Sequence, residues 1–387
     1  MEEKKTKEAP KSFLDYNASW PLTLLYLGFL IGIYFAQQYS GKFLTNNMSY
    51  YAYYLIAVIG GVVVTFLFYN LGKIVFAKKA GYEILYIRLL GFFIDNSRKE
   101  NKVSYDITTF FTISLKFVPK DDDLEKNPKI MFFGGLIFEA LLLIVSLVFL
   151  FAFCINHEKS GISNFGWTFL FAVCYGFLTP LYELIPFRQD YPTDMFNVLM
   201  TNKEEDRKAY NLYLVNLRKE MIGEDFILPT FENYDSFYKL HNLYFVYLQY
   251  LYESKLEKAF SVLEDMKYYS KYYLDDEKYI YNAETVYMKY LIDDEAGANK
   301  AFMAIKRDDR KAVTDPITLT GYRTSLLVLA NIHSDKEGTL QLVKKFDEIV
   351  KSYGENLSAR VKQEVVLFNS AYAKVQKLKP EFELPNR

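Results

Sequence analysis

The sequence predicts an α-helical polytopic membrane protein with a cytoplasmic, all-α domain at its C-terminal end. Residues 1–187 contain four long apolar runs, whereas residues 188–387 contain none and are rich in charged residues. An apolar run of about 20 residues is long enough to cross the hydrocarbon core of a bilayer as a helix. The chain of 387 residues is 51% hydrophobic and 24% charged, which fits a membrane part joined to a soluble part.

Four transmembrane helices are expected after a tail of residues 1–19, within a membrane domain of residues 20–199. A signal peptide would have its apolar region nearer the start, and Ala36-Gln37-Gln38 is a poor cleavage site. The first apolar run is therefore interpreted as a retained helix. The expected spans are residues 20–37, about 52–77, 130–155 and 165–187.

Lysine and arginine are distributed unequally between the segments that flank these spans. The tail holds four and residues 78–129 hold ten, whereas the loops 38–51 and 156–164 hold one each. Positive charge is retained on the cytoplasmic side of a membrane. The sequence therefore predicts a multi-pass protein of the cell membrane whose N-terminus and C-terminal domain are cytoplasmic.

A small antiparallel β-sheet is expected between the second and third spans, over residues 82–118. Residues 82–94 are rich in aromatic and β-branched side chains. Downstream, apolar residues recur with the period of two that is typical of a strand. These residues are Val103, Tyr105, Ile107, Phe111, Ile113, Leu115 and Phe117. The sheet is expected to lie against the inner membrane surface.

The inner end of the second span carries an unusual polar pattern. It reads Phe-Leu-Phe-Tyr-Asn-Leu-Gly-Lys-Ile-Val-Phe-Ala-Lys-Lys-Ala-Gly and places Asn70 and Lys73 in apolar surroundings, where charged and polar groups need a reason. This segment resembles the HELGH-xxFAxxxG motif of the site-2 protease family of intramembrane zinc metallopeptidases. In this resemblance the two histidines of the family correspond to Tyr69 and Lys73, and its glutamate corresponds to Asn70.

Further motifs follow in the order of that family, over roughly residues 52–199. After the β-rich insert, Phe133-Gly134-Gly135-Leu136 opens the third span, as a Gly-Gly or Gly-Pro segment does in the family. The Asn-x-x-Pro motif of the family corresponds to Glu183-Leu184-Ile185-Pro186. Its Asp-Gly motif corresponds to Asp194-Met195, so the resemblance places Asp194 at the third zinc ligand. The chain departs from the family at Glu183 and Met195.

The resemblance implies a degenerate member that lacks the HExxH zinc motif. A catalytic zinc site needs about three protein ligands, and Asn70 cannot accept and return a proton as the glutamate of the family does. The three histidines of the chain are His157, His241 and His333, and none of them lies in the motif. We therefore expect a lost zinc site, no catalytic residue and no cofactor.

Lys73, Glu139, Glu183 and Asp194 are candidates for a polar site inside the membrane domain. Lys73 could take the place of the metal and pair with Asp194 or Glu139, or its long stem could snorkel to the interface. Glu139 lies nine residues into its span and about 14 Å deep, where a carboxyl must be protonated, paired or facing a cavity. An internal hydrogen bond that fixes helix packing is the simpler alternative.

Residues 200–387 are expected to form a cytoplasmic domain of helical hairpins that recur at roughly 40 residues, as in an α-solenoid. Leu256–Leu263 is similar to the second helix of a tetratricopeptide repeat, and a non-repetitive helical bundle is the alternative. The expected helices are residues 206–221, 237–252 with 255–268, 277–292 with 295–306, 317–333 with 336–352, and 357–378.

These patterns favour a proteolytically inactive pseudopeptidase that acts as a binding, regulatory or scaffold protein. The expected partners are a membrane protein or peptide segment at the intramembrane groove and a cytoplasmic protein at the helical domain. Neither half of the chain is basic enough to indicate nucleic-acid binding. Two alternatives are an active intramembrane metallopeptidase with altered ligands and a transport or secretion accessory protein in which Glu139 and Lys73 line a polar path.

Overall fold

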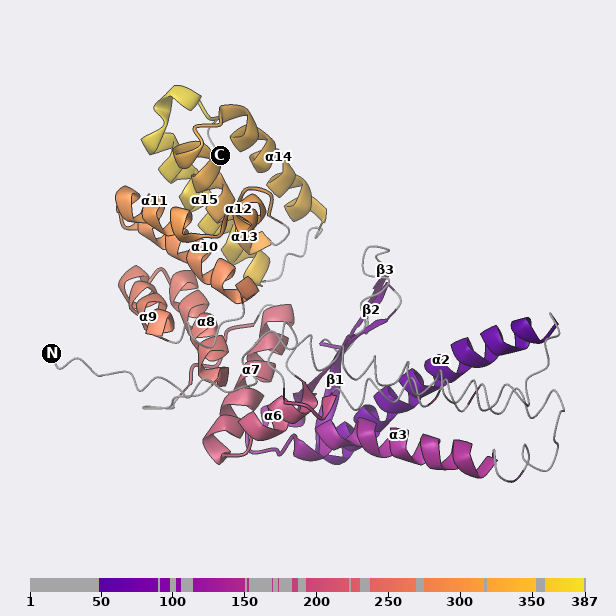
Figure 1. Ribbon diagram of the computed structural model, residues 1–387. Helices are drawn as coiled ribbons and strands as arrows, with labels where there is room; N and C mark the ends of the chain where they lie inside the picture. Colours follow the sequence, from indigo (N-terminus) through magenta and orange to yellow (C-terminus); the bar gives the residue numbers. More distant parts are fainter. Residues whose placement is uncertain are drawn as a thin grey trace. The chain divides into compact units, whose positions relative to one another are not determined.

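The computed structural model describes residues 49–89, 91–97, 102–105, 114–149, 152, 169, 173, 183–186, 193–222, 224–229, 237–268, 275–316, 319–352 and 359–385. Most of these residues are helical, and they include one small antiparallel sheet (Figure 1). The described residues of 49–96 and 102–211 form one compact unit, and those of 212–385 form a second. The predicted combination of many helices with a small antiparallel sheet is confirmed.

Two long apolar helices pack against each other in the first unit, α2 (Ser49–Lys79) and α3 (Lys129–Phe149). Within the described ranges, these two have the length and composition needed to cross a membrane, over Ile59–Lys79 and Lys129–Phe149. They correspond to the second and third spans expected from the sequence. The first expected span and nearly all of the fourth lie outside the described residues, so the expectation of four spans is not confirmed.

Glycines bring the backbones of α2 and α3 into direct contact. A Cβ atom on Gly72 would collide with the carbonyl oxygen of Gly134, and a Cβ atom on Gly134 would collide with that of Gly72. A Cβ atom on Gly135 would collide with the ring of Tyr69. Small residues allow such close approach between apolar helices. The close crossing therefore joins the two segments that carry the motifs described above, and it leaves room for an aromatic ring between the helices.

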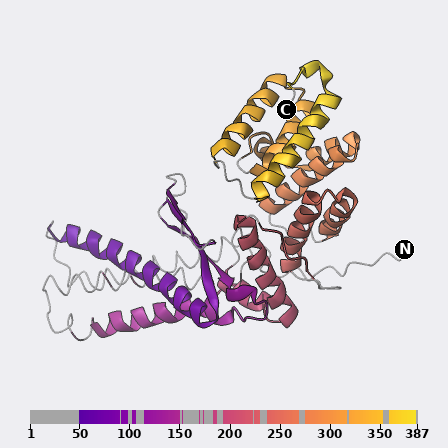
Figure 2. The same cartoon turned by 180° about the vertical axis from the view of Figure 1, so that it is seen from behind.

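The sheet contains four strands in the order β3-β2-β1-β4, and all neighbours are antiparallel. In Figures 1 and 2, β1 starts beside the end at which α2 and α3 meet, and β2 and β3 lie farther from that end. The alternating residues of the sequence pattern lie in β3 and β4 as expected, although residues 106–113 lie outside the described part of the chain. The strands are β1 (Tyr82–Leu89), β2 (Phe92–Asp95), β3 (Lys102–Tyr105) and β4 (Ser114–Pro119).

A polar contact fastens the sheet to the rest of the first unit. After β4 come η3 (Lys120–Asp122), α6 (Asp194–Met200) and α7 (Glu204–Ile222). The hydroxyl of Tyr82 donates to Oδ1 of Asn211 at 2.7 Å, and Nδ2 of Asn211 donates to the carbonyl oxygens of Leu124 and Lys126, both at 2.8 Å. The first unit thus extends through Asn211 within α7, beyond the boundary near residue 200 that the sequence predicts.

The second unit consists of helices that pack as hairpins. Its elements are α8 (Phe237–Tyr252), α9 (Leu256–Tyr268), α10 (Asp275–Leu291), α11 (Glu295–Ala304), α12 (Arg307–Thr314), α13 (Leu319–Leu327), η6 (Val328–Ile332), α14 (Lys336–Ser352), α15 (Ala359–Leu378) and η7 (Pro380–Phe382). The pairs α8–α9, α10–α11 and α13–α14 are in contact, and α15 packs on α13. The short helix α12 was not predicted. The single helix expected over 317–333 ends instead in the π-helical turn η6, because its backbone widens after Leu327.

Each of the three hairpin turns contains one residue with a positive φ angle. Ser254, Asp293 and Ser334 adopt positive φ angles of 57°, 62° and 51°. After the first two, the next backbone N–H returns to a carbonyl five residues earlier, from Lys255 to Tyr250 and from Asp294 to Lys289. This is the Schellman arrangement that ends a helix in a left-handed residue. In the third turn the N–H of Asp335 reaches back six residues, to Leu329, because η6 adds one residue to the last turn.

A polar network lies at the centre of the second unit. Arg323 of α13 is fully buried, and its guanidinium donates to Glu364 of α15 at 2.6 Å and to Glu284 of α10 at 2.7 and 2.8 Å. The hydroxyl of Tyr247 in α8 donates to Glu284, and that of Tyr252 donates to Glu364. Four helices of the unit therefore meet through one set of charge-assisted hydrogen bonds.

Candidate functional site

Asp194 is positioned by the turn that begins α6. Thr193 precedes the helix, and its hydroxyl accepts a hydrogen bond from the N–H of Phe196 while donating to the carbonyl oxygen of Ile185 at 2.7 Å. A threonine at this position satisfies a helix N–H that would otherwise have no partner. The backbone N–H of Asp194 donates to Oε2 of Glu183 at 2.7 Å. These bonds hold the Asp194 carboxylate between α6 and residues 183–186.

Two side chains of α2 meet that carboxylate at the same oxygen. The ammonium of Lys73 lies 2.7 Å from Oδ2 of Asp194, and the hydroxyl of Tyr69 donates to Oδ2 at 2.8 Å. Tyr69 and Lys73 are four residues apart and share a helix face, and the ammonium lies 4.6 Å from the centre of the Tyr69 ring. Tyr69 is 7% exposed and Asp194 is 8% exposed. Three of the four motif positions thus converge on one buried oxygen.

The fourth motif position takes a different direction. The amide of Asn70 donates to the carbonyl oxygen of Phe66, one turn earlier in the same helix, at 2.9 Å. Within the described residues, Asn70 makes no hydrogen bond to Tyr69, Lys73 or Asp194. Asn70 therefore contributes to the backbone of α2 rather than to the polar cluster.

Of the residues proposed for an intramembrane polar site, the structure brings together Lys73, Asp194 and Glu183. The pairing of Lys73 with Asp194 was one of three arrangements that the sequence left open, and it is the one observed. Glu139 is also buried, with 0% exposure, but it forms no ion pair with Lys73 among the described residues. Its two carboxyl oxygens have no hydrogen-bond partner there.

Lys116 of β4 is a further charged residue near this cluster, and its position there is not predicted by the sequence pattern. Burial lowers the pKa of Lys116, the positive charge of Lys73 lowers it further, and Asp194 opposes the shift. The side chain therefore lies within the electrostatic reach of the Lys73–Asp194 pair. A single lysine in an alternating strand is ordinarily expected to face solvent, and local sequence gives no signal that this one is close to a carboxylate.

The arrangement does not fit the zinc ion that the family resemblance would imply. In that resemblance Tyr69 and Lys73 correspond to two imidazole ligands, and the Lys73 ammonium is bonded to the Asp194 oxygen that would have to bind the metal. The described residues contain no group of three or more His, Cys, Asp or Glu side chains that could hold a metal ion. What these side chains can do is neutralise, orient and bury a carboxylate without a metal.

Comparison with known proteins does not place the chain in a family. No protein-family model matches it. No curated protein and no solved structure matches it either. A functional proposal must therefore rest on the contacts of Tyr69, Lys73 and Asp194.

Proposed function

We propose that this chain is a multi-pass membrane protein with a degenerate site-2-protease-like core, which binds membrane or peptide partners without hydrolysing them. The observation that supports this proposal best is the convergence of Tyr69 and Lys73 on Oδ2 of Asp194. The positions of two histidines and of the third ligand are in contact, as in a metal site. A lysine ammonium, and not a metal, provides the positive charge.

Hydrolysis of a peptide bond would need an activated water and a base to accept its proton. The residue at the position of the base, Asn70, has no titratable group, and its amide is occupied by the carbonyl oxygen of Phe66. The Lys73 ammonium offers no open coordination position. The cluster therefore favours a pseudopeptidase, which retains the shape of the family site and lacks its chemistry.

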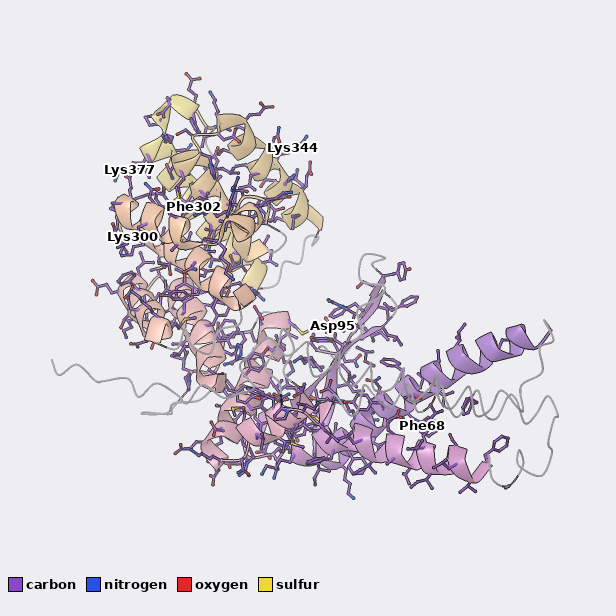
Figure 3. All side chains as sticks on the ribbon, viewed as in Figure 1. Phe68, Asp95, Lys300, Phe302, Lys344 and Lys377 are labelled. Atoms are coloured by element: carbon purple, nitrogen blue, oxygen red, sulfur yellow. The ribbon has the colours of Figure 1, made fainter. Side chains whose placement is uncertain are left out.

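The proposed membrane location is supported by the outer faces of α2 and α3. Apolar side chains project from both helices, including Phe68, which is labelled in Figure 3. Several are about half exposed, which is costly in water for a contiguous surface and favourable in lipid. The most exposed are Ile56, Ile59, Val63, Leu67, Leu71, Ile130, Leu141, Ile144, Val145 and Val148. With the spans expected over 20–37 and 165–187, this gives the proposed four-helix topology with both termini in the cytoplasm.

Partners are proposed for two places. A membrane protein or peptide segment would bind at the intramembrane groove beside the Lys73–Asp194 pair. There β4 is an edge strand of the described sheet, to which an extended segment can add by backbone hydrogen bonds. A cytoplasmic protein would bind the helical second unit. In both cases the chain acts as a regulator or scaffold.

The first experiment is to measure the metal content of the full chain purified in detergent, with Asp194→Ala as the control. We expect no stoichiometric zinc in either protein, because the Lys73 ammonium already neutralises Asp194. One zinc per chain that is lost in Asp194→Ala would overturn the proposal and would favour an active peptidase with altered ligands.

A further inference from the structure

Glu139 is a buried acid that the proposed binding function does not use. It lies in the middle of α3, ten residues after Lys129, which corresponds to about 15 Å along the helix. Its side chain is 0% exposed. Thr65 of α2 is also buried, with 3% exposure, and neither its hydroxyl oxygen nor the Glu139 carboxyl has a hydrogen-bond partner among the described residues.

The charged and titratable groups nearest to Glu139 are already engaged with one another. Tyr69 lies one turn after Thr65 on the same face of α2, and its ring packs on Gly135, one turn before Glu139 in α3. The Tyr69 hydroxyl and the Lys73 ammonium are both bonded to Asp194 of α6, and Glu183 accepts from the Asp194 backbone. Among the residues that the structure describes, Glu139 is therefore left without an ionic partner, although it lies within the electrostatic reach of Tyr69.

An ionised carboxylate in this position would have no compensating positive charge among the described residues, and burial of such a group is very costly. The carboxyl is therefore neutral in the conformation described. On the facing helix, the backbone of Tyr69 interacts with the Glu139 carboxyl, whereas the Thr65 hydroxyl makes no hydrogen bond with it among the described contacts. A neutral acid inside an apolar helix pair, with no ionic partner among the described residues, is suited to binding and releasing a proton.

We propose that Glu139, with the Thr65 hydroxyl on the facing helix, is an intramembrane proton-binding site that is occupied in the conformation described. When water reaches the site, the O–H bond of the carboxyl breaks and the proton passes to water. The carboxylate that remains is then stabilised by that water and by the Thr65 hydroxyl. This site is independent of the loss of zinc, and it would let pH set the charge inside the membrane domain next to the proposed binding groove.

The test is to treat the full wild-type chain, reconstituted in vesicles, with dicyclohexylcarbodiimide. This apolar reagent adds to a protonated carboxylic acid in apolar surroundings and rearranges to a stable acylurea. We expect one adduct per chain, located by peptide mass spectrometry on Glu139, with a labelling rate that falls several-fold from mildly acidic to alkaline pH. A water-soluble carbodiimide should leave Glu139 unmodified.

Two variants and one competing ion make the test specific. Glu139→Gln should abolish the adduct, while Glu83→Gln, at an exposed acid of β1, should retain it. Absence of labelling at Glu139 in the wild-type chain would overturn the proposal, as would a labelling rate that does not depend on pH. Protection by sodium ions at constant pH would also overturn it, since the site would then bind a metal cation. Because the labelling is measured on the wild-type chain, the result does not depend on the folding of a variant.

Discussion

Each of the two units buries a cation against carboxylates, but the two arrangements differ in the kind of cation and in the number of carboxylates that it binds. In the second unit, the Arg323 guanidinium binds two carboxylates, which also accept from two tyrosine hydroxyls. In the first, the Lys73 ammonium and one tyrosine share a single oxygen of Asp194. A second lysine, Lys116, lies close by, and the acid Glu139 has no partner among the described residues.

The difference separates a structural network from a candidate site. The planar guanidinium of arginine suits simultaneous binding of several carboxylate oxygens, so a network that joins two carboxylates in this way stabilises one helix arrangement. Lysine is a point charge on a flexible stem, and its pairing can be exchanged. Burial of charge alone therefore does not identify a functional site, and the exchangeable lysine pair beside the buried acid Glu139 is what distinguishes the first unit.

The largest expected effect is on the network of the second unit. Arg323→Met leaves Glu284 and Glu364 buried without a cation, and removal of one partner from a buried ion pair typically costs about 3–5 kcal/mol. Hydrogen exchange of α10, α13 and α15 in the full chain should show this loss. The matched control is Lys345→Met at an exposed pair with Asp315, which should cost less than about 1 kcal/mol. Equal effects of the two variants would mean that the network is not structural.

Restoring the motif of the resembled family tests whether the side chains at positions 69, 73 and 194 are close enough to bind one metal ion. In the triple variant Tyr69→His, Asn70→Glu, Lys73→His, two imidazoles replace the side chains that now contact Asp194, so the variant should bind one zinc per chain. At free zinc a hundredfold above its Kd, ligand binding would stabilise the fold by about 2.7 kcal/mol. Metal analysis and a zinc-dependent rise in Tm check this. If the variant also contains Asp194→Ala, zinc binding should be lost; a folded triple variant without zinc would contradict the proposed geometry.

Loss of the lysine alone should have an intermediate effect. Lys73→Met leaves Asp194 with the Tyr69 hydroxyl and removes a hydrogen bond to a charged group, which is worth about 2 kcal/mol. Protease resistance of the first unit in detergent measures this change. Lys78→Met is the control, because Lys78 is exposed on the same helix. A Lys73→Met protein that is as stable and as active in partner binding as wild type would show that the buried cation is not needed.

The smallest effect is expected at Lys116 and depends on pH. Its pKa lies below the ordinary value of 10.5, so the folded chain binds this proton more weakly than the unfolded chain. The stability of the first unit should therefore rise as pH increases from the lowered pKa toward 10.5. Lys116→Met should lack this rise, whereas Lys120→Met, at an exposed residue after β4, should retain it. Identical pH profiles for wild type and Lys116→Met would contradict the burial of this ammonium.

Local patterns in the sequence predict the elements well, because periodicity is a property of neighbouring residues. The helix expected over 237–252 is observed as α8, and the alternation around Leu115 and Phe117 is observed as β4. The contact between Lys73 and Asp194 was one of the arrangements considered, since the order of the motifs suggested it. Lys116 was missed because the pairing of β4 with β1 that brings it near the cluster is set by tertiary structure.

The Arg323 network was also missed, although the sequence contains a signal for it. Arg323 is 39 residues after Glu284 and 41 residues before Glu364, and Glu284 is 37 residues after Tyr247. These intervals match the hairpin period of about 40 residues. A search for charged residues at that period would have found them, whereas a search for motifs within single helices could not.

The same spacing of about 40 residues also limits how the number of hairpins in the second unit can change. The central positions of four helices are occupied in turn by Tyr247 of α8, Glu284 of α10, Arg323 of α13 and Glu364 of α15. Each of these side chains therefore complements the next one, as hydrogen-bond donor or as opposite charge. Duplication of the α10–α11 hairpin would place two acids side by side, and deletion of α13–α14 would do the same to Glu284 and Glu364. We therefore expect that the gain or loss of one hairpin would destabilise the second unit unless the charge at its centre changed as well.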